Sequence, residues 1–218
     1  MKGKKKQFLV IGLGRFGSSV ARALCELGHE VLAVDNDPEA VEDISAFVTQ
    51  AIQADATDDE VFASLEAGSY DAAIVSIGSN VRDSILISVL CKEAGVPLVV
   101  AKASDDLHAK VLSKVGVDRV VFPERDMGKR VARALIMPQM LELMSLSGDT
   151  RVAEMLLPEK WQNKTLVQAD IRRNYGVTVL AVRRADQTLT SLSADFLLLP
   201  GDVVLLLGSQ QAIDAIEG

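Results

Sequence analysis

The first two thirds of the chain alternate between short apolar runs and amphipathic stretches of helical period. The runs recur roughly every 20–25 residues and carry few polar residues, as strands covered on both faces do. Strands are predicted at 7–12, 30–35, 50–54, 71–76, 97–101 and 119–122, and helices at 15–28, 38–48, 58–67, 80–94 and 105–115. The pattern therefore predicts an α/β fold with a Rossmann-like, doubly wound parallel sheet.

Glycines follow the last residue of four of these helical patterns, at Gly28, Gly68, Gly95 and Gly116. Glycine adopts left-handed backbone at this position more easily than any other residue. We therefore expect left-handed glycines to end these four helices.

The pattern changes after Pro123. Residues 124–145 are predicted to form one longer helix, bent or broken at Pro138, and 145–150 a linker. Its apolar side would carry Met127, Val131, Leu135, Met140, Leu141 and Met144. A small α+β lobe would follow, with strands at 151–157, 177–184, 187–192 and 203–208 and helices near 166–173 and 210–217. The expected domains are 1–123, a helix and linker at 124–150, and 151–218.

Composition narrows the functional classes. The 218 residues carry a net charge of −7 and are 49% hydrophobic, which is typical of a globular protein. No apolar run approaches the ~18–20 residues of a membrane span. An acidic chain without a basic stripe disfavours nucleic acid as the partner. Two cysteines favour neither a disulfide framework nor a zinc site, so the cytoplasm is the default compartment.

A glycine motif follows the first predicted strand and opens the first predicted helix. It reads Gly12-Leu13-Gly14-Arg15-Phe16-Gly17. The first glycine permits a tight turn, the second lets a phosphate approach the backbone, and the third lets the helix lie close to the sheet. Asp35 ends the second strand and is placed to accept hydrogen bonds from ribose hydroxyls. Because Asn36 and Asp37 follow it, a 2′-phosphate is disfavoured.

Other loops at the carboxyl edge of the sheet supply further candidate ligand contacts, because open α/β sheets bind ligands at this edge. These contacts are Asp55, Ala56 and Thr57 after strand three, Ile77, Gly78 and Asn80 after strand four, and Lys102 after strand five. Asp55 and Asn80 are equally interpretable as helix N-caps. Arg15 is either a phosphate contact or a solvated arginine, and Glu124 is either a helix-capping carboxylate or a cation ligand.

The acid–base groups of a dehydrogenase are not evident. His29 is placed at the far end of the sheet from the nucleotide, and His108 is interpreted as a surface residue. Neither Tyr70 nor Tyr175 is followed by a lysine four residues later. The sequence thus favours binding over catalysis.

The chain resembles the RCK (KTN) regulatory proteins of bacterial potassium transporters, of the TrkA family and its KtrA/KtrC type. The resemblance rests on the glycine motif, Asp35, Asp55-Ala-Thr57, Val75-Ser-Ile-Gly78, Lys114-Val-Gly-Val-Asp-Arg119, Pro123-Glu-Arg-Asp-Met-Gly128, Asp170-Ile-Arg-Arg-Asn-Tyr-Gly176 and Pro200-Gly-Asp-Val-Val-Leu-Leu-Leu-Gly208. It covers essentially the whole chain and identifies no enzyme.

The resemblance implies dimers that assemble into an octameric ring under a membrane potassium channel subunit of the KtrB, KtrD or TrkH type. It implies a cytoplasmic protein attached peripherally to the inner face of the membrane. ATP, ADP or NAD(H) would bind the glycine loop, with ATP activating and ADP inactivating. Arg15 would contact a γ-phosphate across the dimer, and Glu124 would bind Mg²⁺ or Ca²⁺. The helix at 124–145 would exchange between subunits.

The C-terminal lobe of many relatives dimerises and binds cyclic di-AMP as an inhibitor. The corresponding positions here are Leu166, Val167, Asp170, Ile171 and Arg172. The leading hypothesis is therefore a nucleotide-sensing gating subunit that catalyses no reaction. A small NAD(H)-dependent oxidoreductase is the alternative. A redox-sensing transcription factor is a third hypothesis, but it requires a winged helix or basic patch that the sequence does not show.

Overall fold

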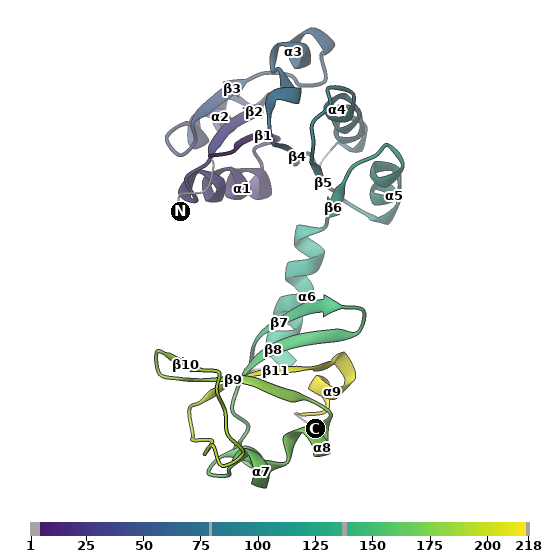
Figure 1. Cartoon of the computed structure of the whole chain (residues 1–218). Helices are drawn as coiled ribbons and strands as arrows, with labels where there is room; N and C mark the ends of the chain where they lie inside the picture. The colour runs from purple at the N-terminus through teal and green to yellow at the C-terminus, as the bar shows by residue number, and fades with distance from the viewer. Residues whose placement is uncertain (1–4, 79, 137–138, 217–218) are drawn as a thin grey trace. The chain divides into compact units, whose positions relative to one another are not determined.

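A computed structural model describes residues 5–78, 80–136 and 139–216. The chain divides into two compact units, Met1–Asp126 and Met127–Gly218, and each is described by itself (Figure 1).

The first unit is built on a six-stranded parallel sheet, which confirms the predicted fold class. Its strands are β1 (Gln7–Ile11), β2 (Glu30–Asp35), β3 (Gln50–Gln53), β4 (Ala72–Val75), β5 (Val99–Lys102) and β6 (Arg119–Val121), in the order β3-β2-β1-β4-β5-β6. The helices are α1 (Arg15–Glu26), α2 (Pro38–Ser45), α3 (Asp59–Ser64), α4 (Val81–Glu93) and α5 (Asp106–Lys114), with a 3₁₀ turn at Ala67–Ser69. This strand order is that of a Rossmann fold.

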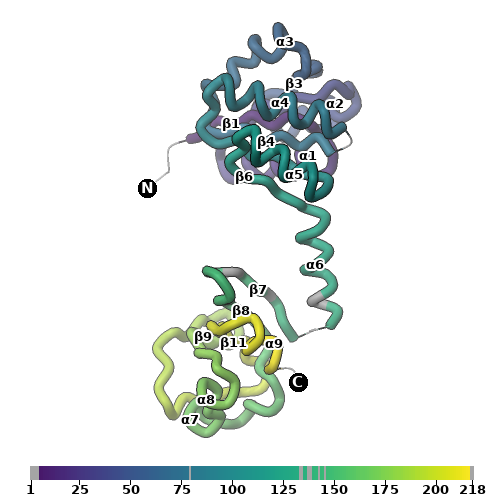
Figure 2. Tube along the Cα trace, turned by 90° about the vertical axis from the view of Figure 1, so that its right-hand side faces the viewer, coloured from purple at the N-terminus to yellow at the C-terminus, as the bar shows by residue number. Residues whose placement is uncertain are grey.

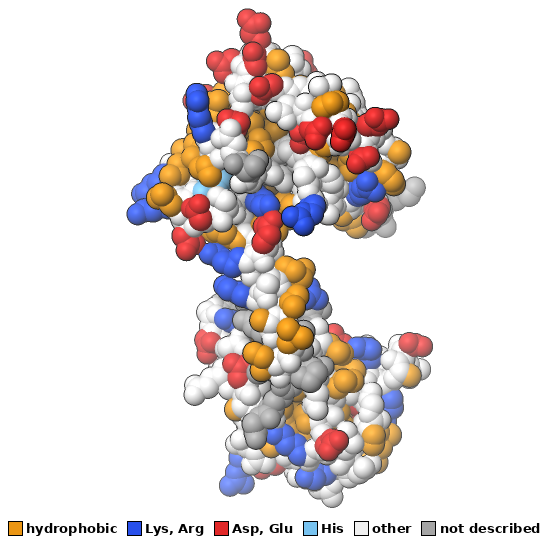
Figure 3. All heavy atoms as spheres, turned by 180° about the vertical axis from the view of Figure 1, so that it is seen from behind, with side chains coloured by type: hydrophobic (Ala, Val, Ile, Leu, Met, Phe, Trp, Pro, Cys, Tyr) orange, Lys and Arg blue, Asp and Glu red, His pale blue; other side chains and the backbone are white. Residues whose placement is uncertain are grey.

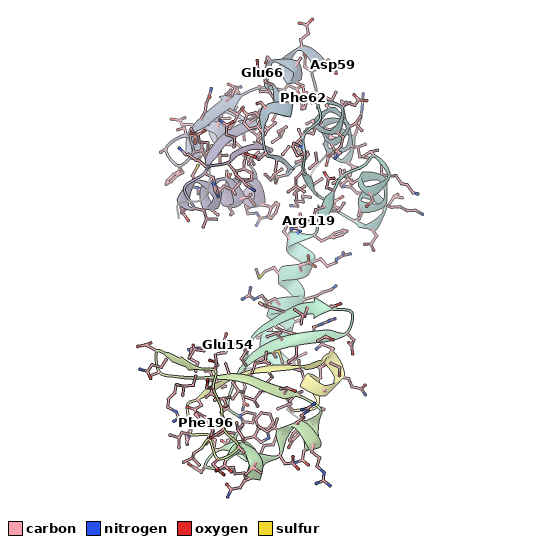
Figure 4. All side chains as sticks on the ribbon, viewed as in Figure 1. Asp59, Phe62, Glu66, Arg119, Glu154 and Phe196 are labelled. Carbon is pink, nitrogen blue, oxygen red and sulfur yellow. The ribbon has the colours of Figure 1, made fainter. Side chains whose placement is uncertain are left out.

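Each face of this sheet packs against its own apolar core. Val10 packs with Ala21 of α1 and Ile44 of α2, whereas its neighbours Leu9 and Ile11 belong to the core of α3, α4 and α5. Successive strand residues point to opposite faces, so both faces are covered (Figure 2). Phe62 of α3 points into this second core, while Asp59 on the same helix points to solvent (Figure 4).

Three of the four predicted left-handed glycines are observed, and Gly68 is the exception. Gly28, Gly95 and Gly116 have φ angles of 87°, 77° and 92°. The left-handed residue after α3 is instead Glu66, with φ 49°. Gly68 answers a different requirement, because a Cβ there would lie 2.3 Å from the carbonyl oxygen of Ala94.

The second unit contains an antiparallel five-stranded sheet. Its strands are β7 (Met140–Ser147), β8 (Thr150–Leu156), β9 (Thr178–Arg184), β10 (Gln187–Leu189) and β11 (Val203–Ser209), in the order β10-β9-β11-β8-β7. The helices are α7 (Leu166–Ala169), α8 (Ile171–Tyr175) and α9 (Gln210–Asp214), with a 3₁₀ turn at Glu159–Trp161. Trp161, Met155, Val204, Leu206 and Ile213 form its core.

The predicted helix over 124–145 is wrong in its second half. Helix α6 (Pro123–Ile136) ends earlier, and Met140, Leu141 and Met144 lie in β7. Pro138 lies outside the described residues. The stretch from Met140 to Ser147 pairs with β8 across a tight turn in which Gly148 has φ 53°. The predicted linker at 145–150 is therefore the turn end of the β-hairpin formed by β7 and β8. The sequence pattern alone does not show this strand pairing.

Two smaller predictions in this unit also needed correction. The single helix expected near 166–173 is two short helices, because Asp170 between them adopts left-handed backbone with φ 42°. The strand expected at 187–192 ends at Leu189.

Over the described residues, no helix is long and apolar enough to cross a lipid bilayer. Helix α6 is amphipathic, and its apolar side chains Met127, Val131, Leu135 and Ile136 are exposed (Figure 3).

Candidate functional site

A pocket of about 970 Å³ opens at the carboxyl ends of the parallel strands, which is the size of a small-molecule site. It is lined by most of the residues predicted as ligand contacts: Gly12, Leu13, Gly14, Asp35, Asn36, Asp55, Ala56, Thr57, Ile77, Gly78, Asn80, Lys102 and Glu124. Arg15, Phe16 and Gly17 do not line it. Arg15 lies exposed in the first turn of α1, next to the pocket wall.

The glycine turn between β1 and α1 leaves open space on its pocket side. Gly12 has φ 93°, which favours glycine, and its N–H donates to the carbonyl of Val34 at 2.9 Å. A Cβ on Gly17 would lie 1.9 Å from the carbonyl oxygen of Gly12, so only glycine lets α1 approach the turn. A Cβ on Gly14 would meet nothing within 4 Å. The turn therefore has room for a ligand beside Gly14.

Asp35 links the end of β2 to this turn. Its Oδ2 accepts a hydrogen bond from the Leu13 N–H at 2.5 Å, and its Oδ1 accepts one from the Asp37 N–H at 2.9 Å. These bonds fix the carboxylate at the pocket wall. Each oxygen keeps a further lone pair that can accept a hydrogen bond from a ribose hydroxyl.

In the loops after β3 and β4, hydrogen bonds show which of the two predicted N-caps, Asp55 and Asn80, caps a helix. Asp55 accepts from the Thr57 hydroxyl at 2.6 Å and from the Thr57 N–H at 2.9 Å, and these bonds hold the pKa of Asp55 below its usual value. Asp55 caps no helix, because the N-cap of α3 is Asp58. Asn80 does cap α4, accepting from the N–H groups of Arg82 and Asp83 at 3.1 and 3.3 Å.

Lys102 and Glu124 form an ion pair at the β5 and β6 side of the pocket. Lys102 Nζ lies 2.6 Å from Glu124 Oε1. The hydrogen bond from Lys102, then that from the backbone N–H of Glu124, lowers the pKa of the Glu124 carboxyl, and the charge of Arg15 adds a smaller contribution. Glu124 is therefore ionised and already held by an ammonium group.

Within one chain, the described residues do not by themselves gather into a metal centre. No three His, Cys, Asp or Glu side chains gather to hold an ion within the part of the chain that the structure describes. Glu124 contributes a single carboxylate, which Lys102 already neutralises. Mg²⁺ and Ca²⁺ bind through several oxygen ligands, so the role of Glu124 as a cation ligand stays a prediction.

Sequence reasoning missed several polar residues that line the pocket: Ser76, Asp37, Asp83 and Ser104. Ser76 is the first residue after β4, and Ser104 is the second residue after β5. This position at the carboxyl edge of the sheet could have identified both. The Ser76 hydroxyl is buried and has no hydrogen-bond partner among the described residues.

The interpretation of His108 as a surface residue is wrong. Its side chain is 1% exposed, and its Nδ1 accepts a hydrogen bond from the Ser104 N–H at 3.2 Å. Burial lowers the pKa of His108, although the nearby charge of Asp105 opposes that shift. Helix α5 presents Leu107 to solvent instead. The histidine thus supports the loop that follows Lys102 at the end of β5.

The positions predicted to bind a second messenger are spread between core and surface. Ile171 is buried in the core of the second unit, and Leu166 packs against it. Val167 and Arg172 are exposed, and Asp170 occupies the left-handed junction of α7 and α8.

Together, a Rossmann-type sheet with an open glycine turn, a strand-end aspartate and an antiparallel second lobe define a two-unit α/β protein with a candidate ligand pocket. Comparison with known families agrees. Residues 8–123 match the TrkA-N domain, and residues 152–217 match the TrkA-C domain.

The chain belongs to the TrkA-N/TrkA-C (RCK) family, as a regulatory subunit of the Ktr type and not an enzyme. It is 38% identical to Ktr system potassium uptake protein C of Bacillus subtilis, over 98% of this chain and 96% of that protein. It is also 38% identical to Ktr system potassium uptake protein A of Vibrio alginolyticus, over 98% and 97%. The oxidoreductase alternative is therefore wrong.

Solved structures support the fold. The GsuK RCK domain superposes with a TM-score of 0.66 at 18% identity, covering 99% of this chain and 47% of that chain.

Proposed function

We propose that this protein is the nucleotide-sensing gating subunit of a Ktr-type potassium uptake system, and that adenine nucleotides bind in the pocket of the first unit. Its full-length relatives are named as Ktr potassium uptake proteins. The observation that carries the ligand assignment is the Asp35 carboxylate, held by Leu13 N–H beside the open space at Gly14. A carboxylate that can accept from ribose hydroxyls, beside open space at a glycine turn, supports a nucleotide as the ligand.

ATP and ADP are the proposed physiological ligands, and NAD(H) is the competing one. The GsuK channel, which has this fold, has been solved bound to NAD and bound to ADP. The pocket itself favours a ligand without a 2′-phosphate, because Asp35, Asn36 and Asp37 stand where a cation would be needed.

Gating needs no chemical step. A ligand shifts a protein between two shapes only through contacts that differ between the shapes. ATP carries one phosphate more than ADP, and Arg15 and Lys102 are the cations close to the pocket that could distinguish the two. Arg15, exposed on α1, is the proposed contact to a γ-phosphate across a dimer.

The proposed partner is a membrane potassium channel subunit of the KtrB, KtrD or TrkH type. The protein would lie on the cytoplasmic face of the membrane as dimers that assemble into an octameric ring. The exposed apolar side of α6, with Met127, Val131 and Leu135, supports exchange of this helix between copies. No step of the proposal depends on a divalent cation, because the described residues of one chain do not form such a site.

The second unit is proposed to bind cyclic di-AMP as an inhibitor, at an interface between two copies. Val167 and Arg172 are the predicted positions that solvent can reach. Replacing Arg172 with Ala should weaken cyclic di-AMP binding and leave ATP binding unchanged. An unchanged affinity for cyclic di-AMP would remove Arg172 from this site.

A thermal-shift panel of ATP, ADP, NADH and cyclic di-AMP tests the assignment. A ligand that binds only the native state raises the melting temperature by mass action. We expect ATP and ADP to raise it, and Asp35→Ala to abolish both shifts. Arg15→Ala should reduce the shift with ATP much more than that with ADP. The proposal fails if neither ATP, ADP nor NADH shifts the wild-type protein.

A further inference from the structure

Among the described residues that line the pocket, one side chain is cationic. This cation forms an ion pair with a carboxylate of the same chain. The ammonium of Lys102 lies 2.6 Å from Glu124 Oε1, and the Lys102 side chain is 17% exposed, whereas that of Glu124 is 70% exposed. The lysine is thus set into the pocket wall, and the glutamate reaches it from the solvent side.

The position of this ammonium is closely defined by the neighbouring loop. A Cβ on Gly78 would lie 3.3 Å from both Cε and Nζ of Lys102, so the lysine passes directly over the backbone that follows β4. Lys102 itself ends β5, and Glu124 lies in the first turn of α6. Three segments therefore meet at one positive charge.

We propose that Glu124 is an internal competitor for Lys102, and that the terminal phosphate of a bound nucleotide displaces it. The inference rests on the proposed function, in which a nucleotide occupies this pocket. Carboxylate and phosphate oxygens both accept charge-assisted hydrogen bonds from an ammonium. A phosphate carries more charge than a carboxylate, and an ion pair with one exposed partner is weak. The exchange therefore favours the phosphate.

Displacement also changes the contacts of α6. The helix begins with Pro123 in the first unit and continues beyond Asp126 into the second. When the phosphate takes Lys102, Glu124 loses its partner in β5, and the first turn of α6 is no longer tied to that strand. Binding of an extra phosphate in the pocket thus removes one contact between α6 and the sheet.

A metal-ligand role for Glu124 predicts a different result. Removing a metal ligand weakens ATP binding when divalent cations are present and changes nothing when they are chelated. Removing a competitor strengthens ATP binding in the chelator, because Lys102 is then free for the phosphate. A gain in ATP affinity in EDTA therefore supports the competitor role, and no change in EDTA supports the metal-ligand role.

The test is calorimetric titration of the full chain with ATP and with AMP in a buffer containing EDTA. We expect Glu124→Gln to bind ATP about two- to fivefold more tightly than wild type, the value of an exposed ion pair. AMP, which lacks the terminal phosphates, should bind both proteins equally. Asp126→Asn is the matched control, since it removes the same charge from the same helical turn and should leave ATP affinity unchanged.

Lys102→Met completes a double-mutant cycle. Alone it should weaken ATP binding about tenfold, the value of a hydrogen bond to a charged group. In the Lys102→Met protein, Glu124→Gln should give no gain, because no ammonium remains to be released. Circular dichroism spectra confirm that each variant is folded.

Several outcomes would overturn the inference. They are an unchanged or weaker ATP affinity of Glu124→Gln in EDTA, an equal gain for AMP, an equal gain in Asp126→Asn, and a gain that persists without Lys102. The last three indicate general relief of charge repulsion. If any of these results is found and the wild-type protein still binds ATP, the inference fails but the proposed function is retained. A wild-type protein that binds no nucleotide refutes both.

Discussion

The two units bury their sheets in different ways. In the first unit the exposed large apolar residues, Leu27, Phe47, Val81, Leu98 and Leu107, all lie outside the strands. In the second unit the strands themselves carry exposed apolar residues, namely Leu141, Met144, Leu146, Leu156 and Leu180. The parallel sheet is covered on both faces and offers its strand ends to a ligand. The antiparallel sheet keeps apolar surface of a kind that marks protein contacts.

Two cation–carboxylate pairs near strand ends, one from each unit, differ in the burial of the carboxylate. In the second unit Arg184 binds Asp202 through two hydrogen bonds of 2.7 Å, and Asp202 is 1% exposed. In the first unit the carboxylate of Glu124 is mostly exposed. A buried carboxylate with both oxygens hydrogen-bonded stabilises one structure, whereas an exposed carboxylate can be exchanged for a ligand.

The largest expected effect is on the core of the second unit. Trp161 is 1% exposed and packs edge to face on Tyr175, with ring centroids 5.3 Å apart. Trp161→Ala should destabilise this unit by about 4 kcal/mol. Hydrogen exchange of the full chain should show lost protection in β8 and β11. Amides of β1 and β4 should keep theirs, and equal loss there would show that the units do not unfold separately.

A somewhat smaller effect is expected at the glycine turn of the first unit. Gly17→Ala places a methyl group 1.9 Å from the Gly12 carbonyl oxygen, so α1 must move away from the sheet. We expect a loss of about 3 kcal/mol in the first unit and loss of nucleotide binding. Gly14→Ala is the control, because the new methyl group meets no atom within 4 Å. It should preserve stability, and an equal loss of stability in both variants would contradict the steric account.

The contrast between these two glycines also shows what sequence alone can predict. The spacing of Gly12, Gly14, Gly17 and Asp35 predicted the turn, its strand and its helix, because each step is local in the chain. The parallel sheet followed from regular apolar runs for the same reason. The ion pair between Lys102 and Glu124 was not predictable, since it joins residues 22 positions apart through the order of the strands.

The second unit was harder to predict because its signals are not local. The stretch from Met140 to Ser147 contains enough apolar residues for a helix face or for a strand. This stretch is a strand because it pairs with β8. That pairing is visible in the folded sheet but not in the sequence pattern. His108 failed for a related reason, since its burial depends on the loop at Ser104 and not on the helical pattern.

The ion pair of the buried Asp202 in the second unit gives the next effect. Asp202→Asn should destabilise this unit by about 2 kcal/mol, because Arg184 loses a charged acceptor. Burial acts to raise the pKa of Asp202, but the hydrogen bonds from Arg184 and the Leu199 N–H outweigh it and lower the pKa. Stability that is complete above pH ~4 should therefore be lost as the pH falls through the lowered pKa.

Urea unfolding followed by the fluorescence of Trp161, the single tryptophan, measures this loss. Glu154→Gln is the matched control, because its pair with Arg183 is partly exposed on both sides. That variant should change stability by less than about 1 kcal/mol. Equal effects of the two substitutions would mean that burial does not distinguish these pairs.

The smallest effect concerns pH in the first unit. Burial lowers the pKa of His108 below its ordinary value near 6.5, so the folded protein holds this imidazole neutral. Above pH ~6.5 neither state takes up a proton there, and stability is constant. Below it the unfolded state binds the proton more readily, so stability falls as the pH drops toward the folded pKa.

Protonation also ends the hydrogen bond from the Ser104 N–H, a loss of about 1 kcal/mol. Hydrogen exchange should therefore report weaker protection after β5 at pH 5.5 than at pH 7.5. His108→Gln should remove most of this dependence, whereas His29→Gln, at the only other histidine, should retain it. If His29→Gln removed the dependence instead, the pH response would lie at the opposite edge of the sheet, where Phe8 packs on that ring. The loop that follows Lys102 would then be independent of pH.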